Sequence, residues 1–436
     1  MPGAVRALDR EILRLALPAL GALIAEPLYV LADTAVVGRL GTDRLAGLAL
    51  ATSVLLIAHS VLIFLAYGTT AAVSRLLGAG DHGGAAHQAV QSLWLATGLG
   101  VALALVGLPL SEPLLVAIGA DDVTLPYALT YLRISLLGLP AMLVVLAGTG
   151  YLRGLQDTFT PLVVALVSAA GNLVLELVLV LGLGFDIGAS ALSTVIAQMG
   201  AAAVYVRMTL RHVGRHDVGL RPHARTLARL GVVGGDLFVR TAALRASLIV
   251  TTAVAASFGT IALAAHHITL EIWNLCALAL DAVAIAGQAL VGRHLGAGDA
   301  SAARRVGDRM LVWGTGAGLV VGGLVLAAHA ALPRLFTDDA AVIAVAGSLL
   351  VVAGVSQPLN GIVFALDGLL IGAGDMRWLA VAMSGAAAAY IPLALVIGAA
   401  GASIDLLWWG LAVLMVLRLV PLSWRWRSDR WAVLGA

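Results

Sequence analysis

Two seven-residue stretches of this chain, 218 positions apart, are nearly identical. Arg75-Leu-Leu-Gly-Ala-Gly-Asp81 in the first half returns as Arg293-His-Leu-Gly-Ala-Gly-Asp299 in the second, and 218 is half of the 436 residues. The same offset relates further pairs without a gap: Gly41 and Gly259, Pro140 and Pro358, Gly150 and Gly368, Asp157 and Asp375. A register held from residue 41 to about residue 160 identifies a duplicated unit. The fold must therefore consist of two similar halves.

The composition identifies the solvent in which these halves fold. Hydrophobic residues make up 61% of the chain and charged residues 11%, with a mean hydropathy of +1.01. Soluble domains carry roughly a quarter of charged residues, so the chain is an integral membrane protein surrounded by the lipid bilayer. The single cysteine, Cys276, excludes an internal disulfide and a metal site built from several cysteines.

Apolar stretches long enough to cross the bilayer, which takes about 20 residues, recur along the chain. The first begins near Leu15 and is too long for the hydrophobic region of a secretory signal. We predict an all-α protein with twelve transmembrane helices, six in each half, near residues 15–37, 45–74, 86–110, 124–152, 160–184, 187–210, 227–256, 260–292, 302–331, 340–373, 376–399 and 403–426.

The arginines between the spans predict the orientation. Placing the N-terminus in the cytoplasm leaves only Arg39, Arg44 and Arg334 outside, so both termini should be cytoplasmic. Because each half has an even number of spans, the halves should be parallel and related by a pseudo-two-fold axis, with the substrate path between them. The predicted parts are an N-lobe at 1–206, a basic linker at 207–229 and a C-lobe at 230–436.

The linker at 207–229 carries six arginines and three histidines. We interpret it as a cytoplasmic loop that obeys the positive-inside rule, since no aromatic side chains or base-reading motif accompany the charges. No nucleic-acid partner is expected.

Ionisable residues inside a membrane helix are costly and usually mark a transport path. In the first half these include Glu26 and Asp33 on the first predicted helix and Glu176 on the fifth. Asn172 and Glu176 are four residues apart, so an amide and a carboxylate share one helical face and can converge on a small cation. Thr194 re-enters at a similar depth on the sixth helix, and Asp33, Glu176 and Thr194 all lie in the outer half of the membrane. The alternative is that Asp33 only extends to the interface and Asn172 only supports a helix contact.

The second half has lost this pattern. The offset of 218 relates Asp33, Asn172 and Glu176 to uncharged residues, namely Thr251, Tyr390 and Ala394. We therefore predict that the cation site belongs to the N-lobe alone.

The C-lobe carries its own set of ionisable residues. His267 and Glu271 are four apart, and Asp281 and Asp367 follow. One interpretation is a proton relay. The other, which we favour, is that buried carboxylates form structural ion pairs with Arg240 and Arg245, with Glu271 and Asp281 as partners. A metal site at His266 and His267 is not expected, because adjacent helical residues point about 100° apart.

These motifs resemble the MATE family of multidrug and toxin extruders, and within it the DinF branch. The resemblance rests on the run from Glu26 to Gly41, on the loop from Arg75 to Asp81 and on Asn172-Leu-Val-Leu-Glu176, and it extends over essentially the whole chain. In this family an N-lobe cation site drives antiport. The resemblance implies these roles: Asp33 as the helix 1 carboxylate, Tyr29 as its neighbour one turn earlier, Asn172 and Glu176 as the helix 5 pair, Thr194 as the helix 6 hydroxyl, and Pro18 as the point at which helix 1 bends.

The chain departs from the family at one position, since Glu176 replaces the aspartate that is usual there. The longer side chain moves the carboxylate by about 1.5 Å, which leaves the coupling ion open between H⁺ and Na⁺. Desolvation of a carboxyl group favours its protonated form, and we lean towards H⁺. Apart from Na⁺ at this site, no metal and no cofactor are expected.

The predicted function is cation-coupled export of a bulky, amphipathic organic compound across the plasma membrane by alternating access. We expect a monomer and no enzymatic activity, since the Gly-rich loops lack the Lys-Ser/Thr of a nucleotide-binding loop. Two alternatives stay open. A major-facilitator carrier has the same six-plus-six organisation, although the basic loop of that group is missing, and a flippase would act on a lipid-linked substrate.

Overall fold

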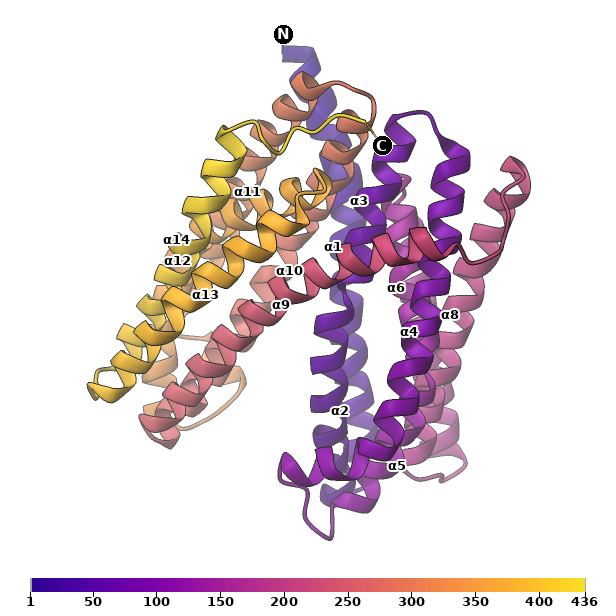
Figure 1. Ribbon diagram of the computed structural model, residues 1–436. Helices are drawn as coiled ribbons and strands as arrows, with labels where there is room; N and C mark the ends of the chain where they lie inside the picture. The colour runs from indigo at the N-terminus through magenta and orange to yellow at the C-terminus, as the bar shows by residue number, and fades with distance from the viewer. Residues whose placement is uncertain (1, 436) are drawn as a thin grey trace. The chain divides into compact units, whose positions relative to one another are not determined.

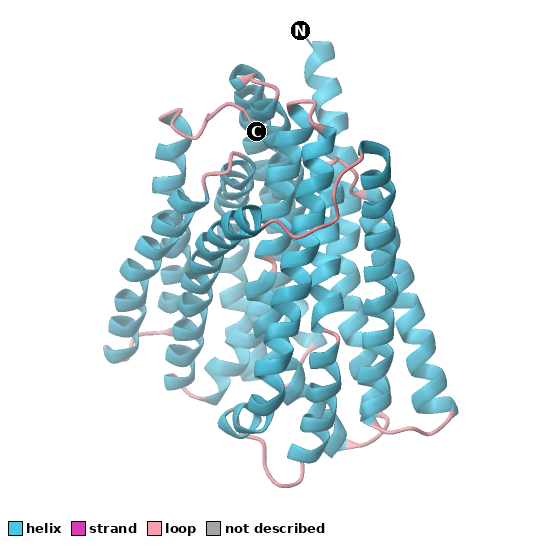
Figure 2. Cartoon of the chain, turned by 45° about the vertical axis from the view of Figure 1, so that its right-hand side comes forward, coloured by secondary structure: helices cyan, strands magenta, loops and turns pink. Residues whose placement is uncertain are grey.

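The computed structural model describes residues 2–435, and the side chains of all of these except 2–4, 60 and 61. Helices are the only regular secondary structure in this described part (Figure 2). Figure 1 follows them along the chain: α1 (Pro2–Gly38), α2 (Thr42–Leu62), α3 (Phe64–Gly78), α4 (His82–Ala117), α5 (Leu125–Leu137), α6 (Leu139–Gly154), α7 (Phe159–Glu176), the π-helix η1 (Leu177–Gly182), α8 (Ile187–His216), α9 (Ala224–Ser257), α10 (Thr260–Gly296), α11 (Ala300–Ala328), the 3₁₀ helix η2 (Leu332–Leu335), α12 (Ala340–Gly372), α13 (Met376–Ala399) and α14 (Ile404–Arg427).

The predicted set of twelve apolar spans is confirmed. Within the described residues, eleven helical segments are long and apolar enough to cross a membrane, and α2 with α3 counts as one of them. The pair α5 and α6, bent by 49°, makes the twelfth when it is counted as one span. Several helices extend beyond the predicted ends. The 36 residues of α4, for example, measure about 54 Å, more than the roughly 30 Å of the hydrocarbon core, because helical hydrogen bonding continues into the polar ends.

The chain divides into two compact units. We call residues 21–234 the N-unit and residues 1–20 with 235–436 the C-unit. The start of α1 therefore groups with the second half of the chain, whereas the sequence placed it in the N-lobe. Two carboxylates on this start account for the grouping. Asp9 binds Arg309 at 2.6 and 2.8 Å, and Glu11 binds Arg293 at 2.8 Å.

The duplication is visible in the turns that connect equivalent helices. Asp81 caps α4 by accepting a hydrogen bond from the backbone N–H of Gly84 at 2.7 Å. In the C-unit, Asp299 caps α11 in the same way, accepting from Ala302 at 2.8 Å. The glycine before each aspartate has a positive φ, 75° at Gly80 and 79° at Gly298, a conformation that glycine adopts without strain.

Within each unit, an equivalent pair of helices packs closely at an equivalent glycine. A Cβ on Gly150 of α6 would collide with the carbonyl oxygen of Ala66, and one on Gly368 of α12 would collide with that of Ala284. Both members of these contacts are related by the same offset of 218. Small residues let membrane helices pack backbone against backbone, so the repeat in the sequence is a repeat of packing within each unit.

The predicted linker is shorter than the range 207–229. Helix α8 continues to His216 and α9 begins at Ala224, which leaves a loop of residues 217–223. The loop is fastened to α4: Gln91 donates to the carbonyl of Arg221 at 3.0 Å and accepts from the N–H of His223 at 2.7 Å, while Trp94 donates to Leu220 at 2.8 Å. The arginine-rich ends of α8 and α9 stay helical because their backbone bonds form locally, whatever the polarity of the side chains.

Candidate functional site

Asp33 on α1 is the centre of a polar cluster inside the N-unit. Its side chain is buried, with 5% exposed. One carboxylate oxygen accepts a hydrogen bond from the hydroxyl of Ser190 on α8 at 2.5 Å, and the other accepts from Tyr131 on α5 at 3.0 Å. Three helices therefore converge on this carboxylate. An aspartate that only reached for the membrane interface would be exposed, so Asp33 is not an interfacial residue in this fold.

A second contact between α1 and α8 lies one helical turn away. The hydroxyls of Tyr29 and Thr194 are 2.5 Å apart, and Thr194 also donates to the backbone carbonyl of Ser190 at 3.3 Å. Residues four apart on a helix share a face. Tyr29 and Asp33 on α1 thus face Thr194 and Ser190 on α8, and the two helices meet through four polar side chains.

Glu176 joins the cluster from α7, with Asn172 one helical turn before it. Both are buried, with 0% and 2% exposed. Among the described residues, neither the amide of Asn172 nor the carboxylate of Glu176 has a hydrogen-bond partner. The carboxylate of Glu176 nevertheless lies within electrostatic range of Asp33 and Ser190. Burying such groups without partners costs on the order of 1–3 kcal/mol each, and a proton or a hard cation shared with Asp33 would lower that cost.

Helix geometry changes immediately after Glu176. The α-helix ends there and continues as the π-helix η1 over Leu177–Gly182. Short π-helical turns occur mostly at functional sites, where they reorient one side chain relative to a regular helix. Glu176 is therefore the last residue of the regular helix and lies at the point where α7 departs from the usual 3.6-residue turn.

The end of η1 is linked to α8 by a loop that sets the start of that helix. Asp186 caps α8 by accepting from the N–H of Ile187 at 2.8 Å, and it binds Arg44 of α2 at 2.6 Å. Burial opposes ionisation of Asp186, but the hydrogen bonds from Arg44 and Ile187 outweigh it and hold the pKa of this carboxyl group below its usual value. Because Ser190 follows one turn later, this cap fixes the residue that contacts Asp33.

The equivalent positions of the C-unit hold an uncharged contact. Thr251 and Tyr390, which correspond to Asp33 and Asn172, are joined by a hydrogen bond of 2.6 Å between their hydroxyls. Ala394 takes the place of Glu176 and is fully buried. Helices α9 and α13, which correspond to α1 and α7, are therefore joined in the C-unit through neutral hydroxyls that need no proton or cation.

The ionisable residues of the C-unit do not form one cluster. His267 and Glu271 are exposed on α10, and Asp281 lies fourteen residues after His267, or about 21 Å along the helix. Asp367 is buried on α12. Its carboxylate accepts from Arg240 at 2.8 Å and from Arg418 at 2.5 Å.

This arrangement agrees with the interpretation as a structural ion pair, although the sequence named other carboxylates. Arg240 contacts Asp367 at 2.8 Å, and the sequence had not paired these two residues. Arg418 of α14, which the sequence assigned to the cytoplasmic side, is a second partner of Asp367 at 2.5 Å. The second guanidinium explains how Asp367 stays buried, because two cations on different helices hold one carboxylate.

Pro18 lies within α1, two residues before the position at which this helix passes from the C-unit to the N-unit. Proline lacks a backbone N–H and cannot complete the helical hydrogen-bond ladder. One missing backbone hydrogen bond of α1 therefore lies close to the boundary between the two units, and Pro27 of the same helix gives another.

Two residues of the cluster were missed in the sequence. Ser190 is one turn from Thr194 on the same helical face, so the spacing alone would have suggested it. Tyr131 has no such signal, because its hydrogen bond to Asp33 spans 98 positions of the chain.

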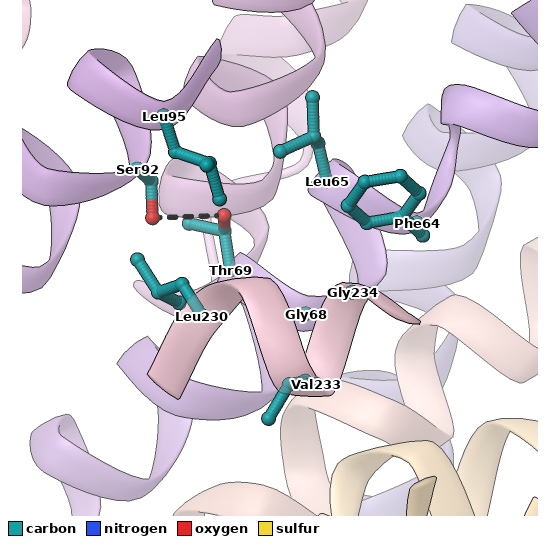
Figure 3. Close-up of a pocket in the computed structure, with 9 residues that line it drawn as sticks. All are labelled: Phe64, Leu65, Gly68, Thr69, Ser92, Leu95, Leu230, Val233 and Gly234. Carbon is teal, nitrogen blue, oxygen red and sulfur yellow. Dashed lines mark hydrogen bonds between the residues drawn. The ribbon is translucent and has the colours of Figure 1, made fainter. Parts of the chain in front are cut away.

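A small pocket elsewhere in the N-unit is not a substrate site. It is lined by α3, α4 and the start of α9, and Figure 3 shows Thr69 donating across it to Ser92 at 3.1 Å. Its volume of about 10 Å³ is no more than one water molecule requires.

Comparison with known proteins agrees with this architecture. The MatE family model matches residues 18–178 and 237–396, one segment in each half of the duplication. DETOXIFICATION 44, a chloroplastic protein of Arabidopsis thaliana, is 33% identical over 97% of this chain and 84% of its own length. The DNA damage-inducible protein F of Escherichia coli is 30% identical over 97% and 94%. A solved structure of MATE in the bent conformation superimposes with a TM-score of 0.88 at 23% identity, covering 98% of this chain and 97% of the other. Members of this family are multi-pass membrane transporters, and this chain belongs to the MATE family.

Proposed function

We propose that this chain is an H⁺- or Na⁺-coupled antiporter that exports bulky, amphipathic organic compounds by alternating access. The observation that carries the proposal is the contact of Asp33 with Ser190 and Tyr131, next to the unpartnered carboxylate of Glu176, inside membrane helices. Buried carboxylates of this kind are characteristic of ion pathways. Family membership supports the transport role and does not favour the major-facilitator or flippase alternatives.

Ion coupling follows from the charge of the cluster. Two ionised carboxylates in a buried space repel each other, and one proton or one Na⁺ shared between Asp33 and Glu176 removes that repulsion. Glu176 is fully buried and lies close to Asp33, and burial of two neighbouring carboxyl groups favours one proton on the pair, so we propose H⁺ as the coupling ion. Asn172 adds an amide oxygen, a ligand that suits Na⁺ as well.

The ion biases the transporter only if its affinity differs between the outward- and inward-open states. In the state described here, Asp33 is bound by Ser190 and Tyr131, and Tyr29 is bound by Thr194. Rotation or bending of α1 would change all of these contacts together, because Tyr29 and Asp33 share one face. We place the bend at Pro18. A related solved structure is described as a bent conformation, which is consistent with such a movement.

We further propose that the protein lies in the plasma membrane with both termini in the cytoplasm. The basis is the positive-inside rule, since the loops at Arg75, Arg153 and Arg293 and the arginine-rich segment 207–229 would then all face the cytoplasm. In this proposal the protein acts as a monomer, moves its substrate unchanged without enzymatic activity, and needs no cofactor besides the coupling ion.

Transport in proteoliposomes tests the proposal. Efflux of a fluorescent organic cation is followed under an imposed H⁺ gradient, an imposed Na⁺ gradient and no gradient. Gradient-driven efflux in the wild type, lost in Asp33→Asn, is the expected result. The matched control is Glu112→Gln, which removes an exposed carboxylate from α4 of the same unit. Efflux that depends on neither gradient, or that is unchanged in Asp33→Asn, would rule out coupling at this site.

A further inference from the structure

Glu26 and His59 form a second polar contact in the N-unit, outside the cluster around Asp33. Nε2 of His59 on α2 is 3.3 Å from a carboxylate oxygen of Glu26 on α1. Half of the Glu26 side chain is exposed, and 22% of His59. The pair is thus more accessible than Asp33, whose side chain is buried.

Both residues lie near the middle of their spans. Glu26 is twelve residues before the end of α1 at Gly38, or about 18 Å along the helix. His59 is seventeen residues after Thr42 and nineteen before Gly78 in the combined span of α2 and α3. The hydrocarbon core is about 30 Å thick. The carboxylate therefore lies well inside its span and not at either end.

An exposed carboxylate at this depth needs a reason. Ionisable residues in the core of a membrane are expensive and line a path for ions or substrate, and secondary transporters bind substrate near the midplane, often next to an interrupted helix. Such an interruption is present here, since α2 ends at Leu62 and α3 begins at Phe64, within two turns of His59.

The position of Glu26 on α1 brings the pair close to the polar cluster around Asp33. Glu26, Tyr29 and Asp33 are spaced by three and four residues and share one helical face. Glu26 lies within electrostatic range of Tyr29, which is bonded to Thr194. A charge that binds at Glu26 therefore lies about two turns from the carboxylate that we propose to bind the coupling ion.

We infer that Glu26 and His59 select the charge of the transported substrate. Protonated His59 forms a neutral ion pair with Glu26 and leaves no net charge to attract a ligand. Neutral His59 leaves the carboxylate free to bind the positive group of an organic cation, so the proton on His59 and the substrate cation compete for one anion. This inference rests on the proposed transport function and adds the residues that recognise the substrate.

Several other charged groups on the elements around His59 are already engaged. On α1, Asp33 is bound by Ser190 and by Tyr131 of α5. Arg133 of α5 donates to Ser111 and lies 4.0 Å from Glu112 of α4. On α2 itself, Arg44 binds Asp186. The pH response of charge selection should therefore follow His59 and Glu26.

Equilibrium binding to the purified, detergent-solubilised full chain tests the inference without any gradient. Tetraphenylphosphonium and tetraphenylborate are suitable probes, because they have nearly the same size and opposite fixed charges. The measured quantity is the ratio of their affinities between pH 5 and pH 8, the range in which histidine side chains change charge. In the wild type, the preference for the cation should rise with pH by about tenfold.

Two variants separate the roles of the pair. Glu26→Gln should remove both the preference for the cation and its pH dependence. His59→Gln keeps a polar side chain without the charge, and it should hold the preference at its high-pH value throughout. If Glu26→Gln retains the wild-type ratio, or His59→Gln retains the wild-type pH profile, the inference is wrong. Thermal melting checks that each variant is folded, and Glu26→Ala, which also removes the carboxylate, replaces Glu26→Gln if the latter is not.

Asp33→Asn distinguishes this inference from the proposed function. It should keep a preference for the cation that rises with pH while abolishing gradient-driven efflux. If Asp33→Asn flattens the ratio and Glu26→Gln does not, charge selection belongs to the Asp33 cluster and the role of Glu26 is overturned. If the ratio behaves as expected but no gradient drives efflux in the wild type, only the proposed coupling fails.

Discussion

The hydroxyl of Ser190 lies 2.5 Å from the carboxylate of Asp33, although 157 positions separate the two residues in the chain. Hydrogen bonds to a charged acceptor are roughly twice as strong as those between neutral groups. This contact therefore affects how readily Asp33 takes up a proton or a cation, and it ties α8 to α1 in the state described here.

Replacing Ser190 tests that contact. Ser190→Ala removes one donor from Asp33, which should shift the ion dependence of efflux by about tenfold, since a hydrogen bond to a charged group contributes about 1.5–3 kcal/mol. The measurement is the H⁺ or Na⁺ concentration for half-maximal efflux. Ser193→Ala is the matched control, because Ser193 is also buried on α8 but donates only to the backbone of Ser190. Equal shifts in both variants would contradict the role of Ser190.

Shortening the carboxylate side chain of Glu176 on α7 tests the choice of ion. Glu176→Gln should abolish coupling, as Asp33→Asn does, because either change removes one of the two carboxylates. Glu176→Asp restores the residue usual in the family and should increase the dependence of efflux on Na⁺. Transport under separate H⁺ and Na⁺ gradients measures both effects. Thr251→Ala, at the position of the C-unit that corresponds to Asp33, should leave the ion dependence unchanged.

The ion pairs of Asp367 should matter for stability rather than for coupling. Asp367→Asn leaves Arg240 and Arg418 without their shared carboxylate, and breaking a buried ion pair from one side costs about 3–5 kcal/mol. We expect a large fall in the melting temperature in detergent, with the ion dependence of the remaining folded protein unchanged. Glu271→Gln, an exposed carboxylate on α10, is the control. Loss of coupling with normal melting in Asp367→Asn would place an ion site in the C-unit.

Close helix packing predicts a contrast between two glycines of α11. A Cβ on Gly318 would lie 2.8 Å from the Cα of Pro358 on α12, whereas one on Gly323 would meet nothing within 4 Å. Gly318→Ala should destabilise the protein by about 1–3 kcal/mol through overpacking. Gly323→Ala should be neutral or stabilising, since alanine favours helix over glycine by up to about 1 kcal/mol. Melting temperatures that change equally in both variants would refute this packing.

The cap at Asp299 predicts an acid-sensitive contribution to stability. Hydrogen bonds from the amide of Ala302 and the hydroxyl of Ser301 hold the pKa of Asp299 below its ordinary value of 3.8. A carboxyl group with a lowered pKa in the folded state stabilises above pH 3.8, and that contribution disappears as the pH falls through the folded-state pKa. The difference in melting temperature between the wild type and Asp299→Ala should therefore shrink below pH 3.8. A difference that stays constant with pH would mean that the charge of Asp299 is irrelevant to the cap.

Much of the fold could be predicted from local patterns. The twelve apolar stretches could be predicted because a membrane helix must satisfy its backbone hydrogen bonds within itself. The offset of 218 and the aspartate caps at Asp81 and Asp299 are likewise properties of short segments. The loss of the carboxylates in the second half, at Thr251 and Ala394, was likewise readable position by position.

The partners of those residues were decided only by the tertiary structure. Tyr131 and Ser190 reach Asp33, Arg418 reaches Asp367, and residues 1–20 group with the second half of the chain. Such contacts depend on how far each helix is rotated about its axis and shifted along its neighbour, and a rotation of about 100° replaces one residue by the next at an interface. Hydrophobicity in a membrane helix does not record that rotation, because lipid-facing and buried surfaces are both apolar. The sequence by itself therefore determined which helices carry the charges, and the packing of α1 against α5 and α8 determined which side chains meet them.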